Sequence, residues 1–255
     1  MKFNHKKSLG QNFLIDKNVA QKIVESVDFN DKNVVEIGCG SGFLTTFLLK
    51  KAKFLHCYEI DSELIPILEN KFKSTKINLI NQDFLEAKLN FTEKQIIIAN
   101  LPYYISSKIL FKIFENIDKF TKLALMLQEE VVQRIVAKVG SNAYSKLTLV
   151  CQYVAKVEMK FRVLPSSFSP PPKVNSAFVV FEIKKNLDSE KMKQFFWFVK
   201  MSFQFRRKTL YNNFKFFMET EKITKIFDFF QFSKNIRPQE ITLETFIALT
   251  EYYFK

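Results

Sequence analysis

Three of the five glycines in the chain lie in one short stretch, Glu36–Gly42, where they occupy positions 38, 40 and 42. Glycine readily adopts positive φ angles and lets the backbone approach a ligand closely. A dinucleotide-binding turn of the Gly-x-Gly-x-x-Gly type would require glycine at position 43, where the chain has Phe43. The observed Gly-x-Gly-x-Gly spacing is typical of methyltransferases, although a tight strand-to-helix turn would use the same glycines.

Two carboxylates follow the next two predicted strands. Glu59 lies at the end of Phe54–Ile60, and Asp83 comes shortly after Ile77–Ile80. The carboxyl ends of parallel strands meet at one edge of a sheet, where a carboxylate can accept hydrogen bonds from ribose hydroxyls. Glu59 suits the ribose, and Asp83 suits an adenine amino group. Either carboxylate alone could be a solvated strand end, but both together with the glycine loop indicate a site for S-adenosylmethionine.

The segment Asn100-Leu101-Pro102-Tyr103 follows a fourth predicted strand and indicates chemistry on an exocyclic base amine. The lone pair of such an amine is delocalised into the ring, so the nitrogen attacks poorly until acceptors hold its N–H groups. The Asn100 side-chain oxygen and the carbonyl of Leu101 or Pro102 can accept those hydrogens, and Tyr103 can stack on the base. The product cation loses its proton readily, so no strong base is required. A proline turn with buried aromatic residues is the structural alternative.

Short apolar stretches alternate with segments of helical period in the first part of the chain, which predicts an α/β fold with a parallel sheet. The expected strands are Asn33–Ile37, Phe54–Ile60, Ile77–Ile80, Gln95–Ala99, Leu123–Leu127, Val157–Val163 and Ala177–Ile183. The expected helices are Phe43–Lys51, Ser62–Lys73, Ser106–Ile117 and Glu129–Val139, with N-caps at Ser62 and Ser106. The proline cluster Pro165–Pro172 predicts a stiff loop before the last strand.

After Ile183 the strand pattern ends and helical patterns follow. The expected helices are Glu190–Arg206, Thr209–Phe217, Ile223–Phe230 and Leu243–Tyr253. We therefore predict a Rossmann-like S-adenosylmethionine-dependent methyltransferase sheet of about seven strands over residues 1–185. A small all-helical domain is expected over residues 186–255, after a polar joint.

The charge and composition of the chain favour a soluble protein that binds nucleic acid. Its 255 residues include 39 Lys and Arg against 26 Asp and Glu, a formal net charge of +13 that attracts polyanions. Its 3 cysteines lack Cys-x-x-Cys spacing and indicate neither a zinc site nor a disulfide framework. No apolar run has the length of a signal peptide or a membrane span. We therefore expect a cytoplasmic monomer with no metal and no membrane partner.

The motifs together resemble those of the ribosomal RNA adenine dimethyltransferases. The resemblance runs over nearly the whole chain and is carried by Ser8–Leu14, Glu36–Gly42, Glu59, Asp83, Asn100–Tyr103, Ser167–Val174 and Phe205–Asn212. The small-subunit branch fits best, and it converts two adjacent adenines near the 3′ end of small-subunit (16S) rRNA to N6,N6-dimethyladenine. The resemblance therefore implies S-adenosylmethionine as the cofactor and the small ribosomal subunit with its rRNA as the partner.

The resemblance also implies roles for individual residues. Those implied to bind the cofactor are Asn12, Leu14, Gly38, Gly40, Glu59, Asp83 and Asn100. Those implied in catalysis are Asn100, Leu101, Pro102, Tyr103 and Phe168, with the target base held between Phe168 and Tyr103. Those implied to contact the phosphates of rRNA are Arg206, Arg207 and Lys208, for which solvated charge at a helix end is the alternative.

Two positions depart from the family pattern. Cys39 stands in the glycine loop where proline is frequent, and Tyr104 follows Tyr103 where asparagine is usual. The second departure bears on the target-base pocket rather than on the reaction. Two other functions stay open: an adenine methyltransferase acting on large-subunit rRNA, as in macrolide resistance, or on DNA, and a nucleic-acid-binding factor that kept the fold without the chemistry.

Overall fold

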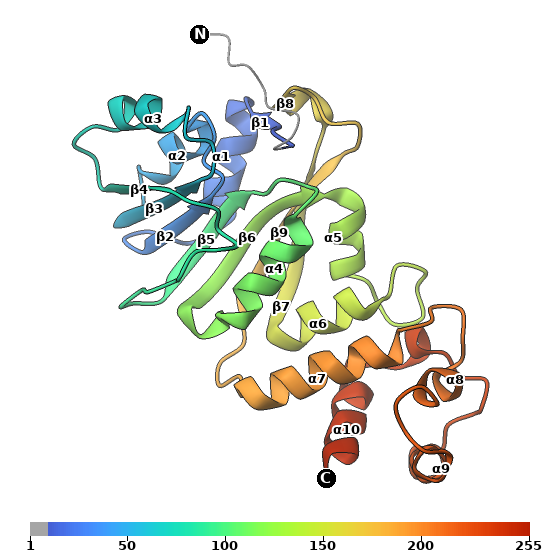
Figure 1. Ribbon diagram of the computed structural model, residues 1–255. Coiled ribbons are helices and arrows are strands. Elements are labelled where there is room, and N and C mark those ends of the chain that lie inside the picture. The colour runs from blue at the N-terminus through green and yellow to red at the C-terminus, as the bar shows by residue number, and fades with distance from the viewer. Residues whose placement is uncertain (1–9) are drawn as a thin grey trace. The chain divides into compact units, whose positions relative to one another are not determined.

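A computed structural model describes residues 10–255 of the chain, and Figure 1 shows its helices and strands. Two compact units make up the fold. The first takes the chain up to Val132 together with Glu158–Ile183, and the second takes Gln133–Val157 and Lys184–Lys255. The predicted domain boundary after residue 185 stays a prediction. Ser8 and Leu9 of the N-terminal motif lie outside the described residues.

The strands are β1 (Phe13–Leu14), β2 (Asn33–Ile37), β3 (Phe54–Glu59), β4 (Ile77–Asn81), β5 (Gln95–Asn100), β6 (Phe120–Gln128), β7 (Ala155–Val163), β8 (Phe168–Ser169) and β9 (Ser176–Ile183). The helices are α1 (Lys17–Glu25), α2 (Phe43–Leu48), α3 (Ile65–Lys71), α4 (Ser106–Glu115), α5 (Glu129–Ile135), α6 (Lys146–Val154), α7 (Ser189–Ser202), α8 (Leu210–Phe214), α9 (Thr220–Phe229) and α10 (Leu243–Phe254). Short 3-10 helices cover Ile117–Lys119, Pro165–Ser167 and Pro238–Glu240.

The main sheet has seven strands in the order β4-β3-β2-β5-β6-β9-β7, as the sequence predicts for a doubly wound fold. Strand β2 lies between β3 and β5 and runs parallel to both. The chain adds β3 and β4 on one side of β2 and then crosses to add β5 and β6 on the other side, which makes this position the switch point of the sheet. Strand β9 returns antiparallel to β6. In doubly wound sheets the ligand binds at the carboxyl ends of the strands, next to such a switch point. The topology therefore places the candidate site beyond the ends of β2 to β5.

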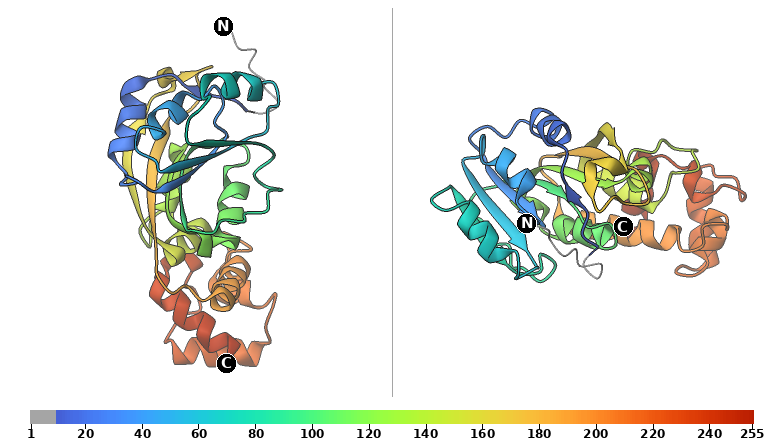
Figure 2. Two further views of the ribbon diagram at one scale, coloured as in Figure 1. Left: turned by 90° about the vertical axis from the view of Figure 1, so that its left-hand side faces the viewer. Right: turned by 90° about the horizontal axis from the view of Figure 1, so that it is seen from above.

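Buried aliphatic side chains explain why the central strands form. In β5, Ile96, Ile97, Ile98 and Ala99 are all buried, as expected for a strand covered on both faces. Helices α1 and α2 cover one face of the sheet and α4 covers the other, as the side view in Figure 2 shows. The parallel strands are therefore rigidly held, and their carboxyl ends form a fixed platform.

The two predicted N-caps are wrong. Helix α3 begins after Leu64, which makes no side-chain capping bond. The preceding turn is organised by Asp61 and not by Ser62. The Asp61 carboxylate accepts from the Glu63 backbone N–H at 3.2 Å, and the Asp61 carbonyl accepts from the Leu64 N–H at 3.0 Å. Ser106 is the first residue inside α4 and donates its hydroxyl to the Tyr103 carbonyl at 3.1 Å.

Several elements escaped the sequence prediction. Helix α1 begins after Asp16, whose carboxylate accepts from the Asn18 and Val19 backbone N–H groups. Helix α6 has buried residues on most of its surface, so it lacks a clear polar side. Helix α5 was predicted, but it ends at Ile135 rather than at Val139. Strands β1 and β8 have two residues each and form a separate small sheet, too short to leave a periodic pattern.

The second unit is built around aromatic side chains. Phe198 of α7 meets Phe214 of α8 at a centroid distance of 5.5 Å, and Tyr153 of α6 stacks on Phe195 of α7 at 4.2 Å. Such pairs contribute about 0.5–1.5 kcal/mol each beyond their area burial. The large phenylalanine content of the chain is thus partly explained by the core of this unit. Within residues 10–255, none of the helices is long and apolar enough to cross a membrane.

Asn213 in α8 fixes the turn that carries the three basic residues of positions 206–208. Its side chain is fully buried, and its Oδ1 accepts from the Phe205 backbone N–H at 2.8 Å. Its Nδ2 donates to the carbonyls of Phe205 at 3.2 Å and Thr209 at 3.0 Å. One amide therefore binds both ends of the Phe205–Thr209 turn.

We expect Asn213→Ala to destabilise the second unit by about 2–4 kcal/mol, because several buried backbone groups would lose their partner. Urea unfolding followed by the fluorescence of Trp197, the single tryptophan, reports on this unit. The exposed neighbour variant Asn212→Ala is the matched control and should unfold like the wild type. Equal midpoints for the two variants would contradict the role assigned to Asn213.

Candidate active site

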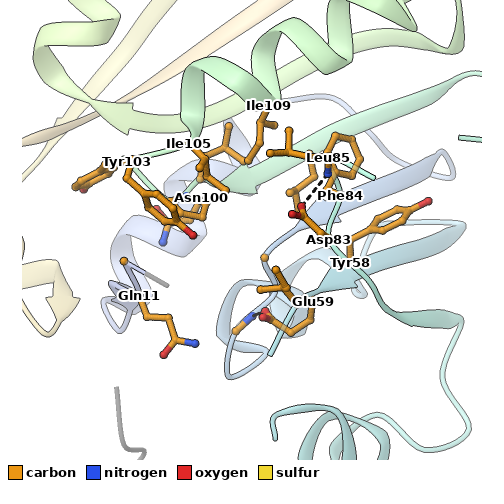
Figure 3. A pocket seen from close by; sticks show the side chains of 18 of the residues that line it. Gln11, Tyr58, Glu59, Asp83, Phe84, Leu85, Asn100, Tyr103, Ile105 and Ile109 are labelled. Carbon is orange, nitrogen blue, oxygen red and sulfur yellow. Dashed lines mark hydrogen bonds between the residues drawn. The ribbon is translucent and has the colours of Figure 1, made fainter. Parts of the chain in front are cut away.

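A cavity of about 310 Å³ opens where the parallel strands β2 to β5 end. Its volume lies in the range of small-molecule sites. Figure 3 shows Glu59 and Asp83 on one side of this cavity and Asn100 and Tyr103 on the other. The carboxylates and the Asn100–Tyr103 segment, which the sequence placed in one site, therefore come together in the first unit.

The glycine loop is held by its backbone amides. Gly38 and Gly40 have φ angles of 70° and 55°, in the left-handed region that favours glycine. The Gly38 N–H donates to the Tyr58 carbonyl at 2.8 Å, and the Gly40 N–H donates to Glu59 Oε2 at 2.7 Å. A Cβ on Gly40 would lie only 2.7 Å from the ring of Phe13. The loop thus presents bare backbone to the cavity in one fixed conformation.

The two carboxylates keep acceptor capacity for a ligand. Glu59 is buried and accepts from the backbone N–H groups of Gly40 and, at 2.9 Å, Asp61. Burial raises the pKa of the Glu59 carboxyl, and the two backbone donors oppose that shift. Asp83 Oδ1 accepts from the Leu85 N–H at 2.8 Å, the dashed line in Figure 3. The two oxygens of a carboxyl group have more lone pairs than these backbone donors occupy, so both side chains can also accept from hydroxyl or amino groups.

Apolar side chains close the carboxylate end of the cavity. Tyr58, Ile60 and Phe84 line it, and the rings of Tyr58 and Phe84 meet edge to face at a centroid distance of 5.2 Å. An adenosyl group needs apolar walls for its base and acceptors for its ribose hydroxyls and amino group. The glycine loop, the carboxylates and these walls therefore fit S-adenosylmethionine.

Asn100 is oriented by the N-terminal segment of the described chain. Its Nδ2 donates to the Asn12 carbonyl at 3.0 Å, and the Asn12 side chain donates to the Gly10 carbonyl at 3.2 Å. With the Asn100 amide nitrogen engaged, its oxygen is the atom able to accept from a ligand. Leu101 is buried and its N–H donates to the Met126 carbonyl at 3.2 Å, which holds the segment at the end of β5.

The ring of Tyr103 is held at its far end. Its hydroxyl shares a hydrogen bond with the hydroxyl of Ser176, the first residue of β9. Burial raises the pKa of the Tyr103 phenol, so the ring stays neutral near pH 7. A fixed, neutral aromatic ring beside a hydrogen-bond acceptor is suited to hold a flat base.

The comparisons with known proteins agree with this geometry. Residues 2–254 match the family described as ribosomal RNA adenine dimethylase. The chain belongs to this family. A curated relative, ribosomal RNA small subunit methyltransferase A of Mesomycoplasma hyopneumoniae strain J, is 60% identical over 98% of this chain and 96% of its own length.

Solved structures have the same fold. A dimethyladenosine transferase from Plasmodium falciparum matches with a TM-score of 0.83 at 26% identity, over 95% of this chain and 98% of its own. The 23S rRNA methyltransferase ErmE matches with a TM-score of 0.75 at 22% identity, over 96% and 100%. The predicted family and fold class are confirmed, and S-adenosylmethionine is the cofactor of this rRNA adenine dimethylase.

Most of the predicted site residues of this rRNA adenine dimethylase line the cavity. They are Asn12, Gly38, Gly40, Glu59, Asp83, Asn100, Leu101, Pro102 and Tyr103. Leu14 and Phe168 do not line it, because they pair across β1 and β8 and are 4% and 2% exposed. Leu14 instead lines a small neighbouring recess. The side chain of Cys39 is buried in that recess and lies outside the main cavity, so the departure from proline leaves the main cavity unaltered.

Sequence reasoning missed several residues of the site. The walls Ile60 and Phe84 directly follow the two predicted carboxylates, so their position in the chain was an available signal. Gln11 donates its side-chain amide to Asp61 Oδ2 at 3.0 Å, which joins the N-terminal segment to the end of β3. Neither this contact nor the bond of Ser176 to Tyr103 left a signal in the sequence, because each joins residues distant along the chain.

The basic residues of positions 206–208 lie in the second unit. Arg206 Nη2 donates to the Asn142 carbonyl at 3.1 Å and lines a recess together with Arg134 and Arg237. The Lys208 ammonium lies over the Phe205 ring, 4.6 Å from its centroid. The unit thus presents several cations near one another, as a surface for phosphates would require.

Glu36 lies buried beneath the glycine loop and does not face the main cavity. Its Oε2 accepts from the Thr45 hydroxyl at 2.7 Å and lies 3.5 Å from Cys57 Sγ. Burial raises the pKa of this carboxyl from 4.5 to about 8. The group is therefore protonated in the folded protein near neutral pH while it is ionised in the unfolded chain.

We expect Glu36→Gln to remove a pH-dependent cost of folding. Because the folded pKa lies above the unfolded one, the wild type should lose stability as pH rises from about 4.5 to about 8, by at most about 5 kcal/mol, and no further above that. The measurement is the melting temperature of both proteins at pH 5, 6.5 and 8. The increase in melting temperature caused by the substitution should grow with pH. A difference in melting temperature that is the same at all three pH values would contradict this assignment.

Proposed function

We propose that this rRNA adenine dimethylase transfers methyl groups from S-adenosylmethionine to N6 of two adjacent adenines near the 3′ end of small-subunit (16S) rRNA. The product is N6,N6-dimethyladenine, made during maturation of the small ribosomal subunit. The observation that carries the proposal is the Asn100 amide, oriented by the Asn12 carbonyl beside the anchored ring of Tyr103. The name of the 60% identical relative supports the small subunit as the substrate.

The protein contributes orientation and hydrogen-bond acceptors rather than a base. S-adenosylmethionine supplies an electrophilic methyl group. The Asn100 side-chain oxygen accepts one hydrogen of the adenine amine, which draws the nitrogen lone pair out of conjugation with the ring. The Pro102 carbonyl already accepts from the Ile105 N–H at 3.3 Å, so the Leu101 carbonyl is the better second acceptor. Placing amine and acceptors in this geometry removes much of the entropic barrier.

Tyr103 holds the base in the plane that these acceptors require. Stacking on an aromatic ring contributes about 1–3 kcal/mol per base. Phe168 would complete the sandwich if its side chain turned out of the β1–β8 sheet. The target adenine must leave its own stack to reach the cavity. Attack of the amine on the methyl group gives a positively charged nitrogen, and this acidic cation releases its proton to water, so no titratable group is needed there.

We propose that the partner is the small ribosomal subunit and that a monomer of this chain binds it in the cytoplasm. Residues 1–185 would bind the cofactor and target base, and residues 186–255 would contact rRNA. Arg206, Arg207 and Lys208 would bind its phosphates, which suits the net charge of +13.

The deciding experiment is transfer of radiolabelled methyl groups to immature small subunits, to large subunits and to naked rRNA, with nucleoside analysis of the product. We expect N6,N6-dimethyladenine in small subunits alone. Label in large subunits would favour the macrolide-resistance activity. Cofactor binding without any label would favour a nucleic-acid-binding factor.

We expect Asn100→Ala to abolish methyl transfer, because the amine would lose its oriented acceptor. Cofactor binding, measured by calorimetry, should weaken but stay measurable. The control is Ser107→Ala, which changes an exposed residue of α4 that does not line the cavity. Turnover near the wild-type value in Asn100→Ala would refute the role assigned to this side chain.

We expect the double variant Arg206→Ala with Arg207→Ala to weaken rRNA binding and to flatten its salt dependence. Loss of two phosphate contacts should reduce the slope of log K against log salt by about 1.4–1.8. Lys193→Ala with Lys200→Ala removes the same charge from exposed positions on α7 and is the control. An unchanged slope in the arginine variant would contradict the phosphate contacts.

A further inference from the structure

Tyr104 exposes an aromatic ring at the mouth of the candidate active site. It lines the cavity together with Tyr103, yet its side chain is 58% exposed. This exposure exceeds the 50% of Ile60, the other exposed apolar residue of the lining. A large ring left in water next to a ligand site is a ready surface for a second apolar or aromatic group.

The ring of Tyr104 is held in place from one direction. A Cβ added to Gly10 would lie 2.7 Å from Cδ1 of Tyr104, so the ring packs directly against the Gly10 backbone. Gly10 has a φ of 57°, a conformation that other residues rarely adopt. A ring that already packs on one side loses less conformational entropy when a ligand stacks on it than a ring that is free on both sides.

A cation lies one helical turn further along the chain. Lys108 of α4 lines the same cavity and is exposed. Within the part of the chain that the structure describes, no carboxylate lies within ion-pair distance of its ammonium group. The acidic residues of the cavity, Glu59 and Asp83, lie across it from Tyr103, as Figure 3 shows.

We propose that Tyr104 and Lys108 form a subsite for the nucleotide that adjoins the target adenine in the RNA strand. The base of that nucleotide stacks on Tyr104, and its phosphate meets Lys108. This inference rests on the proposed function, which supplies a single-stranded RNA substrate with two adjacent adenines. Stacking on aromatic rings combined with cationic contacts to the backbone is the general chemistry by which proteins hold unpaired RNA.

Tyr103 and Tyr104 are held by different contacts, and we therefore expect them to bind different nucleotides. Tyr103 is half-buried and its hydroxyl is bound to Ser176, so its ring belongs to the interior of the cavity. Tyr104 packs against Gly10 and faces water. A strand that inserts one base beside Tyr103 leaves its neighbouring nucleotide at the mouth, where Tyr104 and Lys108 lie.

The direct probe is a short oligoribonucleotide with 2-aminopurine next to one adenine, titrated with the full chain in the presence of S-adenosylhomocysteine. Stacking on an aromatic ring quenches the fluorescence of 2-aminopurine. We expect quenching with the wild type and with Tyr104→Phe. Tyr104→Ala should lose most of the quenching and bind about tenfold more weakly. Phe111→Ala, which removes an exposed ring of α4 outside the cavity, is the matched control.

Steady-state kinetics on unmethylated small subunits provide the second readout. Tyr104→Ala and Lys108→Met should each raise the KM for the subunit several-fold, with kcat and the KM for S-adenosylmethionine within about twofold. Lys112→Met, one turn beyond Lys108 and outside the cavity, should leave all three constants unchanged.

The outcomes separate this inference from the proposed function. Methyl transfer by the wild type, with unaltered quenching and KM in Tyr104→Ala, would overturn the subsite alone and leave Tyr104 as a packing residue. An absence of quenching with the wild type would overturn it as well. If the wild type methylates no small subunit, the proposed function fails, while quenching lost in Tyr104→Ala would still support a nucleotide subsite.

Discussion

The hydrogen bonds that the Glu59 carboxylate accepts from Gly40 and Asp61 are the constraint on which the cofactor end depends. Burying a carboxylate is costly unless donors satisfy it, and here two backbone amides do so. In return the carboxylate fixes the glycine loop against the end of β3. The loop can then keep its left-handed conformation and offer backbone to a ligand. The parallel sheet supplies this arrangement, because it brings the ends of β2 and β3 side by side.

The end of the cavity that we propose for the target base is fixed instead by segments far apart in the sequence. Asn12 lies 88 positions before Asn100, whose amide it orients, and Ser176 lies 73 positions after Tyr103, whose hydroxyl it binds. Neither contact involves a formal charge. The two ends of the cavity therefore differ in kind: one carries carboxylates held by backbone amides, and the other carries neutral acceptors and a neutral ring. This difference suits a ligand with polar hydroxyl groups on one side and a flat base on the other.

The sequence contained the features whose signals are local. Strands β2 to β5 were predictable because each is a short run rich in β-branched or apolar residues, and Glu59 and Asp83 were predictable because they end or closely follow such runs. Ser62 was wrong as a cap because Asp61 organises the turn before α3, and Ser106 was wrong because α4 already begins at this residue. The burial of Phe168 could not be read from its neighbours, since it follows from pairing with Leu14 across a two-stranded sheet. Long-range pairing of this kind leaves no periodicity.

The group in the first unit whose pKa is raised to about 8 lies under the glycine loop rather than beside the target base. Glu36 accepts a hydrogen bond from Thr45 of α2, the helix that follows the loop, and burial is the main cause of its raised pKa. The acceptors that we propose for the base amine are an amide oxygen and a backbone carbonyl, which do not titrate. The carboxyl group whose pKa is raised to about 8 therefore belongs to the glycine loop and not to the proposed acceptors of the base amine. In the proposed reaction the methylated ammonium group releases its proton to water, so no titratable side chain is required at that end.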